Sequence, residues 1–439
     1  MLRCCLHTLA SVLATFAVAS IQAFAVCPAT PSTMLTGDAD DGASYYTHPI
    51  ADDVKTLQVI ADDDFMKLPV IDNSSNSSLR ISFDILSDEV QYLQYYIVHC
   101  DAGWQRDDLS ELDYADGFMP VRVTDVTASF NTFVNYWHYC IDFPNEDVAL
   151  QVSGNYAVVI HPEDDADAPV AVACFSVTEQ MAFVCGEVSG NTDIDYRQEH
   201  QQLTLQCTWS ASRLPNLDPA AELMLAVTQN HRPDTRRIIT TPSRMAAGQA
   251  WYEHNGALIY EAGNTFRRFE FIDRHYATLG IEALRYDAPY YEVLVTPQQA
   301  RSGSYYRFDQ DQHGHYLVHS VNVSDEDTEC EYFWANFRLA GAMPPKGSGG
   351  IYLTGDFTYG ELTDACRMTY DVEEQCFKGR VLLKQGHYNY QFITGGSKPS
   401  LAVCEGNYYE THNQYDIYVY YRGMGARYDR LLGVARLEN

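Results

Sequence analysis

The chain has 439 residues, which is more than one ordinary hydrophobic core can organise, so we expect several domains. Hydrophobic residues make up 46% of the chain and aromatic residues 13%, with 32 tyrosines, and this composition indicates a folded protein that favours strands over helices. The formal net charge of −30 argues against nucleic acid and anionic lipid as partners, and it favours solubility or a basic partner surface.

The start of the chain, residues 1–25, is predicted to be a cleaved signal peptide. Arg3 provides a positive charge, an apolar stretch follows, and Ala23-Phe24-Ala25 forms a small-residue cleavage site. Cys27 would suit a lipoprotein, but Val26 stands where a small glycine or alanine is required. We therefore favour cleavage after Ala25.

The mature chain is expected to be exported without inserting into a membrane. No later run reaches the roughly 18 consecutive apolar residues that a spanning helix requires. Residues 26–50 are mostly small and polar, so we expect a flexible N-terminal segment there.

A first β-sandwich domain is predicted at residues 51–180. Short runs rich in β-branched and aromatic residues indicate strands. The runs lie at residues 54–60, 79–86, 95–100, 133–143, 154–161 and 170–177. Pro144 ends the fourth run, because proline lacks the N–H group that a strand ladder requires.

A long polar segment, residues 101–125, separates two of these runs. It holds seven acidic residues beside Trp104, Tyr114 and Phe118, which we expect to be exposed. A loop of this length is too long for a hairpin, and long ordered loops on rigid scaffolds often carry function. Because aromatic side chains dominate interface energies, these three are candidate contacts with a partner protein. The alternative, a surface excursion that packs on its own domain, stays open.

Seven segments spread over the chain carry a family resemblance. They are IVHCDAGW at residues 97–104, DYADGF at 113–118, SFNT at 129–132, FPNED at 143–147, NTFRRFE at 264–270, Tyr305-Tyr306 and GARYDRLLGV at 425–434. In this order they resemble signature segments of the type IX secretion plug family. The resemblance implies a periplasmic protein that closes the periplasmic mouth of a very large outer-membrane translocon barrel. That barrel would be its partner.

A second β-rich domain is predicted at residues 181–328. Its expected strands lie at residues 203–209, 223–228 and 257–260, and a basic connection at 232–244 separates the last two.

Two segments invite comparison with calcium sites. The tip of one predicted hairpin holds four acids, Glu163, Asp164, Asp165 and Asp167, which a solvated turn explains better. Residues 309–314 imitate the start of a calcium loop, but Ser320 replaces the bidentate glutamate that completes it. The sequence predicts no calcium at either place.

Three histidines, His313, His315 and His319, would share one face of a predicted strand, which is a weak hint of a transition metal. A glycine-containing hairpin with exposed histidines is the favoured interpretation. No metal site is predicted.

The remaining residues, 329–439, are predicted to form an immunoglobulin-like E-set β-sandwich. The segments IYLTGDF at residues 351–357, RMTY at 367–370 and QGHYNYQF at 385–392 precede a last strand at 415–421. They resemble the E-set modules that bind starch. Those modules usually have a tryptophan after Gly-Asp-Phe, where this chain has Thr358 and Tyr359, and the stacking platform for a sugar ring is weakened. A secreted glycan-binding protein that uses this module is the alternative function.

Of the twelve cysteines, ten remain after the predicted cleavage, and their spacings do not suggest zinc. Cys366 and Cys376 lie five residues on either side of Asp371, so a simple hairpin centred there would set them opposite each other. Directly opposed residues have Cα atoms about 4.5 Å apart, which a disulfide tolerates. We predict a disulfide, with two buried free thiols as the alternative.

No catalytic motif stands out. The chain lacks a Gly-x-Ser-x-Gly elbow, a His-Glu-x-x-His pair and a P-loop. We therefore expect no enzymatic activity and no cofactor, and we predict an all-β protein of three tandem sandwich domains that acts as a plug.

Overall fold

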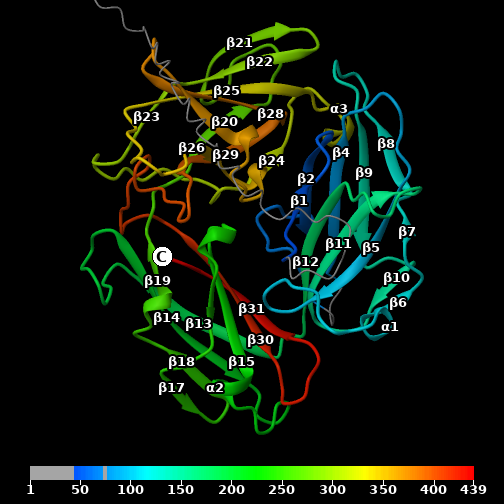
Figure 1. The fold of residues 1–439 in the computed structure, drawn as a ribbon, viewed down its shortest axis with the longest axis vertical. Helices are drawn as coiled ribbons and strands as arrows, with labels where there is room; N and C mark the ends of the chain where they lie inside the picture. The colour runs from blue at the N-terminus through cyan, green and yellow to red at the C-terminus, as the bar shows by residue number, and fades with distance from the viewer. Residues whose placement is uncertain (1–43, 73–76) are drawn as a thin grey trace, which may run out of the picture. The chain divides into compact units, whose positions relative to one another are not determined.

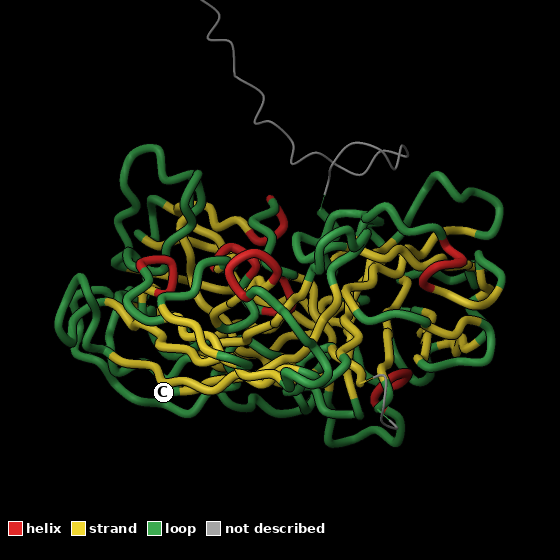
Figure 2. The backbone as a smooth tube through the Cα atoms, turned by 90° about the horizontal axis from the view of Figure 1, so that it is seen from below, coloured by secondary structure: helices red, strands yellow, loops and turns green. Residues whose placement is uncertain are grey.

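The structure, a computed structural model, describes residues 44–72 and 77–439, so the predicted signal peptide lies outside the described residues. Strands account for almost all of the regular secondary structure in this part of the chain, and loops and a few one-turn helices connect them (Figure 2). The prediction of an all-β protein is confirmed. Within the described ranges, no helix is long and apolar enough to cross a membrane.

The first unit consists of two antiparallel sheets that share one hydrophobic core. One sheet has the order β1-β12-β11-β5-β7, with β3 parallel to β12, and the other has the order β2-β4-β9-β8. The strands are β1 (His48–Pro49), β2 (Val54–Ala61), β3 (Val70–Asp72), β4 (Leu79–Ile85), β5 (Leu93–Cys100), β7 (Val121–Arg122), β8 (Asp125–Ala128), β9 (Trp137–Phe143), β11 (Gly154–Pro162) and β12 (Ala171–Thr178).

Aromatic pairs fill the core of the first unit. The Phe83 ring stacks on Tyr139 at 5.1 Å between centroids, and Tyr156 stacks on Phe175 at 5.6 Å. Every residue of β12 is buried on both faces of its sheet. The inner face packs on the shared core, and a strand from the second unit, β31 (Arg430–Glu438), packs against β12 and β11. This explains why the strand reads as a continuous apolar run.

The end of the predicted flexible segment, residues 26–50, is ordered where the structure describes it. His48 pairs with Val172 across β1 and β12, and Tyr45 is only 8% exposed. The Tyr45 N–H donates to the Trp104 carbonyl at 2.8 Å. Polar composition suggested a loose segment, but these backbone hydrogen bonds hold it against the first unit.

The second unit also has two sheets around one core, and it is closed by strands from the end of the chain. The orders are β13-β14-β18-β17, with β19 on β14, and β16-β15-β30-β31 (Figure 1). Besides β31, its elements are β13 (Ala182–Ser189), β14 (His200–Trp209), α2 (Pro219–Glu222), β15 (Leu223–Gln229), η1 (Pro233–Thr235), β16 (Arg237–Ile239), β17 (Arg244–Ala246), β18 (Gln249–Tyr252), η2 (Gly256–Leu258), β19 (Ile259–Glu261) and β30 (Gln414–Tyr421).

The third unit is built on a 10-stranded sheet around an aromatic core. Its main path is β20-β29-β26-β27-β28-β25-β22-β21, while β23 pairs with β25 and β24 pairs with β29. The elements are β20 (Arg267–Phe271), β21 (Ile281–Asp287), β22 (Tyr290–Val295), β23 (Gln298–Gln299), β24 (Tyr316–Val318), α3 (Glu326–Glu329), β25 (Tyr332–Ala340), β26 (Ile351–Thr354), η3 (Asp356–Thr358), η4 (Asp364–Cys366), β27 (Arg367–Asp371), β28 (Cys376–Lys384) and β29 (Gly386–Thr394).

The boundaries of the second and third units differ from the predicted division at residues 328 and 329. The strands β20 to β24, expected in the second domain, belong to the same sheet as β25 and β29. The strand expected to close the E-set module, at residues 415–421, pairs instead with β15, with Leu223 opposite Tyr421. The prediction that residues 329–439 form a separate C-terminal E-set module is therefore wrong. Strand spacing in sequence cannot reveal a partner almost 200 residues away.

The prediction of a disulfide between Cys366 and Cys376 is also wrong. In the ladder between β27 and β28, Cys376 lies opposite Asp371, because the turn occupies residues 372–375 and is not centred on Asp371. Cys366 lies in η4, before β27 begins. Both cysteines are buried free thiols.

Candidate functional site

The predicted long loop, residues 101–125, is folded along most of its length. It contains the one-turn helix α1 (Glu111–Tyr114) and the strand β6 (Ala115–Gly117), which pairs with β10 (Val148–Leu150). Its end forms β7, which adds to the edge of the sheet at β5. Short ladders therefore fix the loop on the first unit.

The loop begins with a tight turn built by Asp101. One carboxylate oxygen, Oδ1, accepts hydrogen bonds from the N–H of Gly103 at 2.8 Å and of Gln105 at 2.9 Å. Trp104 sits between them with φ of 63°, in the left-handed region that few non-glycine residues adopt. Asn155 Nδ2 donates to the Asp101 carbonyl at 2.8 Å and ties the turn to β11.

A buried histidine–carboxylate pair holds the middle of the loop. His99 Nδ1 lies 2.5 Å from Asp107 Oδ2, and the two side chains are 0% and 3% exposed. His99 Nε2 lies 3.1 Å from the Ser153 carbonyl, and Asp107 Oδ1 accepts from the Leu109 N–H at 3.0 Å. Since each polar atom here has a partner, the pair fixes the loop without an unsatisfied charge.

A second loop, residues 422–429 between β30 and β31, lies beside the first. Asp429 Oδ2 accepts from the Ala102 N–H at 2.8 Å, and its other oxygen pairs with Arg422 Nε at 2.7 Å. Arg427 Nη2 pairs with Asp113 Oδ1 at 3.0 Å. The Arg427 guanidinium and the Ser110 hydroxyl hold the pKa of Asp113 well below its usual range. We call residues 101–118 and 422–429 together the two-loop surface.

The three aromatic residues predicted as contacts occupy different environments. Phe118 is 95% exposed, as expected for a contact residue, and Trp104 is partly buried. Tyr114 is only 3% exposed, and its hydroxyl donates to the Ile97 carbonyl at 2.8 Å. It belongs to the core of the first unit, so its expected exposure is wrong. Helix α1 turns this face of the loop inward, which a polar sequence context does not reveal.

The structure adds two exposed apolar residues that sequence reasoning missed. Leu112 is 87% exposed on α1, and Met424 is 98% exposed in the second loop. The pair of Asp113 with Arg427 brings the neighbouring segments together. A methionine flanked by Gly423 and Gly425 in a polar turn was a usable signal, because nothing in such a turn explains a large apolar side chain.

Uncompensated acids accompany these apolar side chains. Asp108, Glu111 and Asp116 are exposed and make no ion pair within the described part of the chain. Such charge attracts a basic partner surface and speeds encounter with it.

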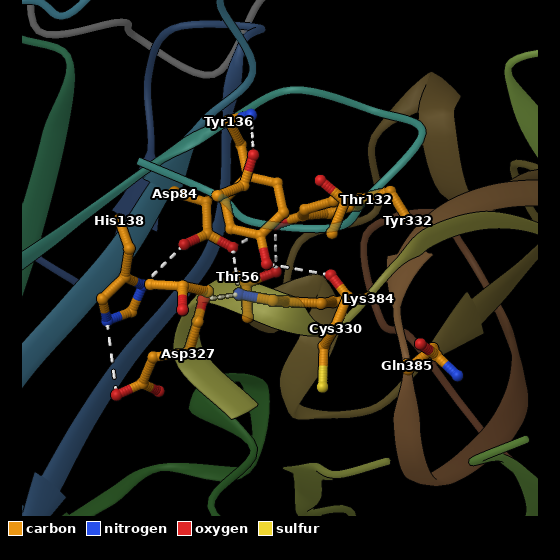
Figure 3. Close-up of polar contacts among 12 residues, drawn as sticks. Thr56, Asp84, Thr132, Tyr136, His138, Asp327, Cys330, Tyr332, Lys384 and Gln385 are labelled. Carbon is orange, nitrogen blue, oxygen red and sulfur yellow. Dashed lines mark hydrogen bonds and ion pairs between the residues drawn. The ribbon is translucent and has the colours of Figure 1, made fainter. Parts of the chain in front are cut away.

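A buried ionic cluster joins the first unit to the third (Figure 3). Asp84 on β4 receives Lys384 Nζ at 2.7 Å on Oδ2 and faces His138 Nδ1 at 2.6 Å on Oδ1. The Tyr332 hydroxyl donates to Oδ2 at 2.7 Å. Asp84 is fully buried and Lys384 is 1% exposed, so the carboxylate is neutralised by contacts and not by water.

The same cluster sets the protonation of His138. Burial works against the charged imidazolium, but the hydrogen bond that His138 donates to the Asp84 carboxylate outweighs it and raises the pKa of His138 to about 10. Burial likewise opposes ionisation of Asp84, and Lys384 with His138 holds the pKa of the carboxyl below its usual value. One buried anion thus faces two cations. The cluster is an electrostatic link between units, with no exposed nucleophile.

The histidines predicted on one strand face have separate partners. His315 Nδ1 lies 2.5 Å from Asp356 Oδ2, and His313 Nδ1 lies 3.5 Å from Asp311. His319 pairs with Glu326. Over residues 44–72 and 77–439, no group of three or more His, Cys, Asp or Glu side chains is arranged to hold a metal ion.

The fold, with its exposed two-loop surface and buried links between units, is that of an all-β protein built from several packed sheets. Residues 54–179 match the family model described as Type 9 secretion system plug protein 1st domain. The crystal structure of a hypothetical protein from Parabacteroides merdae ATCC 43184 is similar, at 37% identity with a TM-score of 0.87, covering 90% of this chain and 100% of that chain. No curated protein matches the chain. The chain belongs to the type 9 secretion system plug protein family.

Proposed function

We propose that this protein is a non-enzymatic plug that closes the periplasmic mouth of the type IX secretion translocon barrel when no substrate is passing. The family match over residues 54–179 carries this proposal. A pore wide enough for folded proteins would leak when idle, and a folded body seated at its mouth prevents that. The protein would act in the periplasm, after export by the predicted signal peptide, and would touch the barrel without entering the membrane.

Rigidity supports this role, because a body that occludes a pore must keep its shape. The Asp84–Lys384 contact links the first and third units, and the contact of Asp429 with the Ala102 N–H links the first and second. Buried, well-aligned polar contacts between packed units resist relative motion. The three units would therefore seat as one body.

The two-loop surface is the proposed contact with the barrel. Phe118, Met424 and Leu112 supply exposed apolar anchors, and the acids around them supply charge. Large apolar side chains carry much of the energy of an interface, while a polar rim keeps the contact reversible. A plug must leave during transport, so a mixed surface of this kind suits it.

The glycan-binding alternative required a surface platform after Gly355-Asp356-Phe357. Phe357 is 8% exposed, and the Tyr359 hydroxyl accepts from the Leu57 N–H at 2.9 Å. These side chains point into protein contacts. No observation at this segment favours a sugar platform on the surface.

Co-purification tests the proposal. The tagged protein is recovered from detergent-solubilised cell envelope, and the amount of translocon barrel is measured. The double variant Phe118→Ala/Met424→Ala should reduce recovery of the barrel at least about tenfold, as expected for loss of two interface anchors. Tyr305→Ala is the matched control, because Tyr305 is 96% exposed in the third unit.

Two results would contradict the proposal at different levels. Absence of the barrel from the wild-type eluate, together with retention of the protein on polysaccharide resin, would refute the plug function. Recovery of the barrel at equal levels with wild type and double variant would refute the assigned contact surface only.

A further inference from the structure

A cavity of about 520 Å³ lies where the three units meet. Its walls come from β2 and the preceding residues 44–47 of the first unit, from β15 and β30 of the second, and from β24 and η3 of the third. Ligand pockets in proteins typically enclose roughly 300–1,000 Å³ and lie between domains. Gly103 and Trp104 of the two-loop surface reach its wall, but the proposed plug function does not use the cavity as a binding site.

Aromatic side chains line much of the cavity wall. They are Tyr45, Tyr46, Phe65, Trp104, Tyr316, Tyr359 and Tyr418. The face of an aromatic ring carries partial negative charge, so it attracts the weakly positive C–H groups on one face of a saturated ring. A wall of this kind suits a saturated ligand ring that has one apolar face.

Two histidine–carboxylate pairs stand together in the polar part of the wall. His231 Nδ1 lies 2.8 Å from Asp416 Oδ2, and His315 Nδ1 lies 2.5 Å from Asp356 Oδ2. The two imidazole rings are 4.3 Å apart between centroids. Each carboxylate therefore already faces a cation or a hydrogen-bond donor.

One buried polar atom in this wall, His315 Nε2, has no hydrogen-bond partner within the described residues. Asp416 Oδ2 has its ion pair with His231 but no hydrogen bond of good geometry. The His315 side chain is 10% exposed and that of Asp416 is 2% exposed. Buried polar atoms are rarely left unpaired, because each loses its hydrogen bonds to water. A hydroxyl group that enters the cavity can pair with His315 Nε2, and another can add a hydrogen bond to Asp416 Oδ2.

The charges around the cavity favour a neutral ligand. Arg436 Nε pairs with Asp416 Oδ1 at 2.8 Å, in addition to His231. Of the other cations in the wall, Lys67 pairs with Asp62, and Arg236 donates to the Ala102 carbonyl. A charged ligand would disturb this balance and lose its own hydration. Hydroxyl groups both donate and accept, so they suit an imidazole nitrogen and a carboxylate oxygen alike.

We propose that this cavity binds a neutral monosaccharide unit, with ring hydroxyls bonded to His315 Nε2 and Asp416 Oδ2 and one ring face on the aromatic wall. The site is a partly open cavity between units and is distinct from the surface platform of starch-binding modules. Asp356 and Tyr359, from the segment that resembles those modules, line it.

Thermal unfolding and calorimetry of the mature protein test the proposal. The probes are D-glucose, D-galactose, D-mannose and N-acetyl-D-glucosamine, each titrated alone, with acetate and putrescine as charged comparisons. At least one saccharide should raise Tm saturably and bind with a measurable Kd, since a ligand that binds only the native state stabilises it.

Two variants locate the binding. Gln58→Trp places a large side chain in the cavity wall and should abolish the Tm shift. His315→Phe keeps an aromatic ring but removes Nε2, and it should weaken affinity about tenfold, the loss expected for one buried hydrogen bond. Tyr305→Ala, which is remote from the cavity lining, should bind as wild type. Circular dichroism confirms folding of each variant.

Three results would overturn the inference. The first is no saturable binding of any of the four saccharides, which would leave the two polar atoms to water. The second is binding of acetate or putrescine in their place, which would change the ligand class. The third is saccharide binding of unchanged affinity in a folded His315→Phe variant, which would place the site elsewhere even if Gln58→Trp failed to fold.

Discussion

Lys384 Nζ lies 2.7 Å from Asp84 Oδ2, although 300 residues separate the two in sequence. The lysine ends β28 of the third unit, and the aspartate lies on β4 of the first. Neither side chain is more than 1% exposed. A charge so deeply buried persists only with an opposite charge and further hydrogen bonds, which His138 and Tyr332 provide.

Breaking this contact from one side should be costly. Lys384→Met is expected to lower the free energy of unfolding by about 3–5 kcal/mol, because it leaves the Asp84 carboxylate short of a cation. Arg80→Met is the matched control. Arg80 lies on β4, the strand that also carries Asp84, and it pairs with Asp142 on β9, but its side chain is 45% exposed. This variant should cost less than about 1 kcal/mol. Urea unfolding measures both values, and equal losses would show that the buried contact has no special weight.

The same cluster predicts a dependence of stability on pH. Because the pKa of His138 is raised from 6.5 to about 10, its contribution is fully present below pH 6.5 and is lost as pH rises through 10. The pKa of Asp84 is lowered, so its contribution is present above 3.8 and is lost on acidification. The difference in unfolding free energy between wild type and His138→Gln should thus shrink between pH 6.5 and 10. A difference that stays constant over that interval would contradict the raised pKa.

Much of the local structure could be predicted from sequence. The runs at 54–60 and 79–86 became β2 and β4 almost residue for residue, because β-branched and aromatic residues fit a half-buried strand. Partners could not be predicted, since the pairing of β30 with β15 depends on a long return of the chain. One signal was available at Asp84, an acid inside the apolar run 81–86. Such a residue needs a partner, but sequence does not name it.

The sequence predicted where the candidate site lies but not which residues form its surface. Loop length pointed to residues 101–125, and Phe118 is exposed there. The contribution of residues 422–429 depends on the contact of Asp429 with the Ala102 N–H, which joins segments 327 positions apart. Tyr114 was misplaced because a one-turn helix decides which side of the loop faces the core.

Tyr114 and Phe118 should respond oppositely to truncation. Tyr114→Ala removes a buried ring and its hydrogen bond, so unfolding free energy should fall by about 3–5 kcal/mol. Phe118→Ala should change it by less than about 0.5 kcal/mol, because the side chain is 95% exposed. Denaturant titration compares the two, and a large loss for Phe118→Ala would mean that this ring packs on its own protein.

The free acids of the two-loop surface should govern association with a basic partner. Changing Asp108, Glu111 and Asp116 to Asn, Gln and Asn should slow binding to the purified barrel, and the difference should fade at high salt as exposed charges are screened. The matched control neutralises three exposed acids of the same unit that lie in the turn between β11 and β12, namely Asp164, Asp165 and Asp167. Surface plasmon resonance gives the rates. Equal slowing by both triples would indicate a general charge effect and no local contact.

The last prediction concerns Cys366 and Cys376, which the hairpin register keeps apart. Cys376 faces Asp371 across the ladder, and Cys366 lies in η4 before the strand. Burial raises the pKa of the Cys366 thiol to about 11, so little reactive thiolate forms near neutral pH. Both cysteines should resist alkylation in the native protein, whereas the exposed Cys185 should react. After denaturation without reductant, both should be alkylated in full. Mass spectrometry of the digested protein measures the alkylation of each cysteine. Detection of the two peptides joined by a disulfide would contradict the register of β27 on β28.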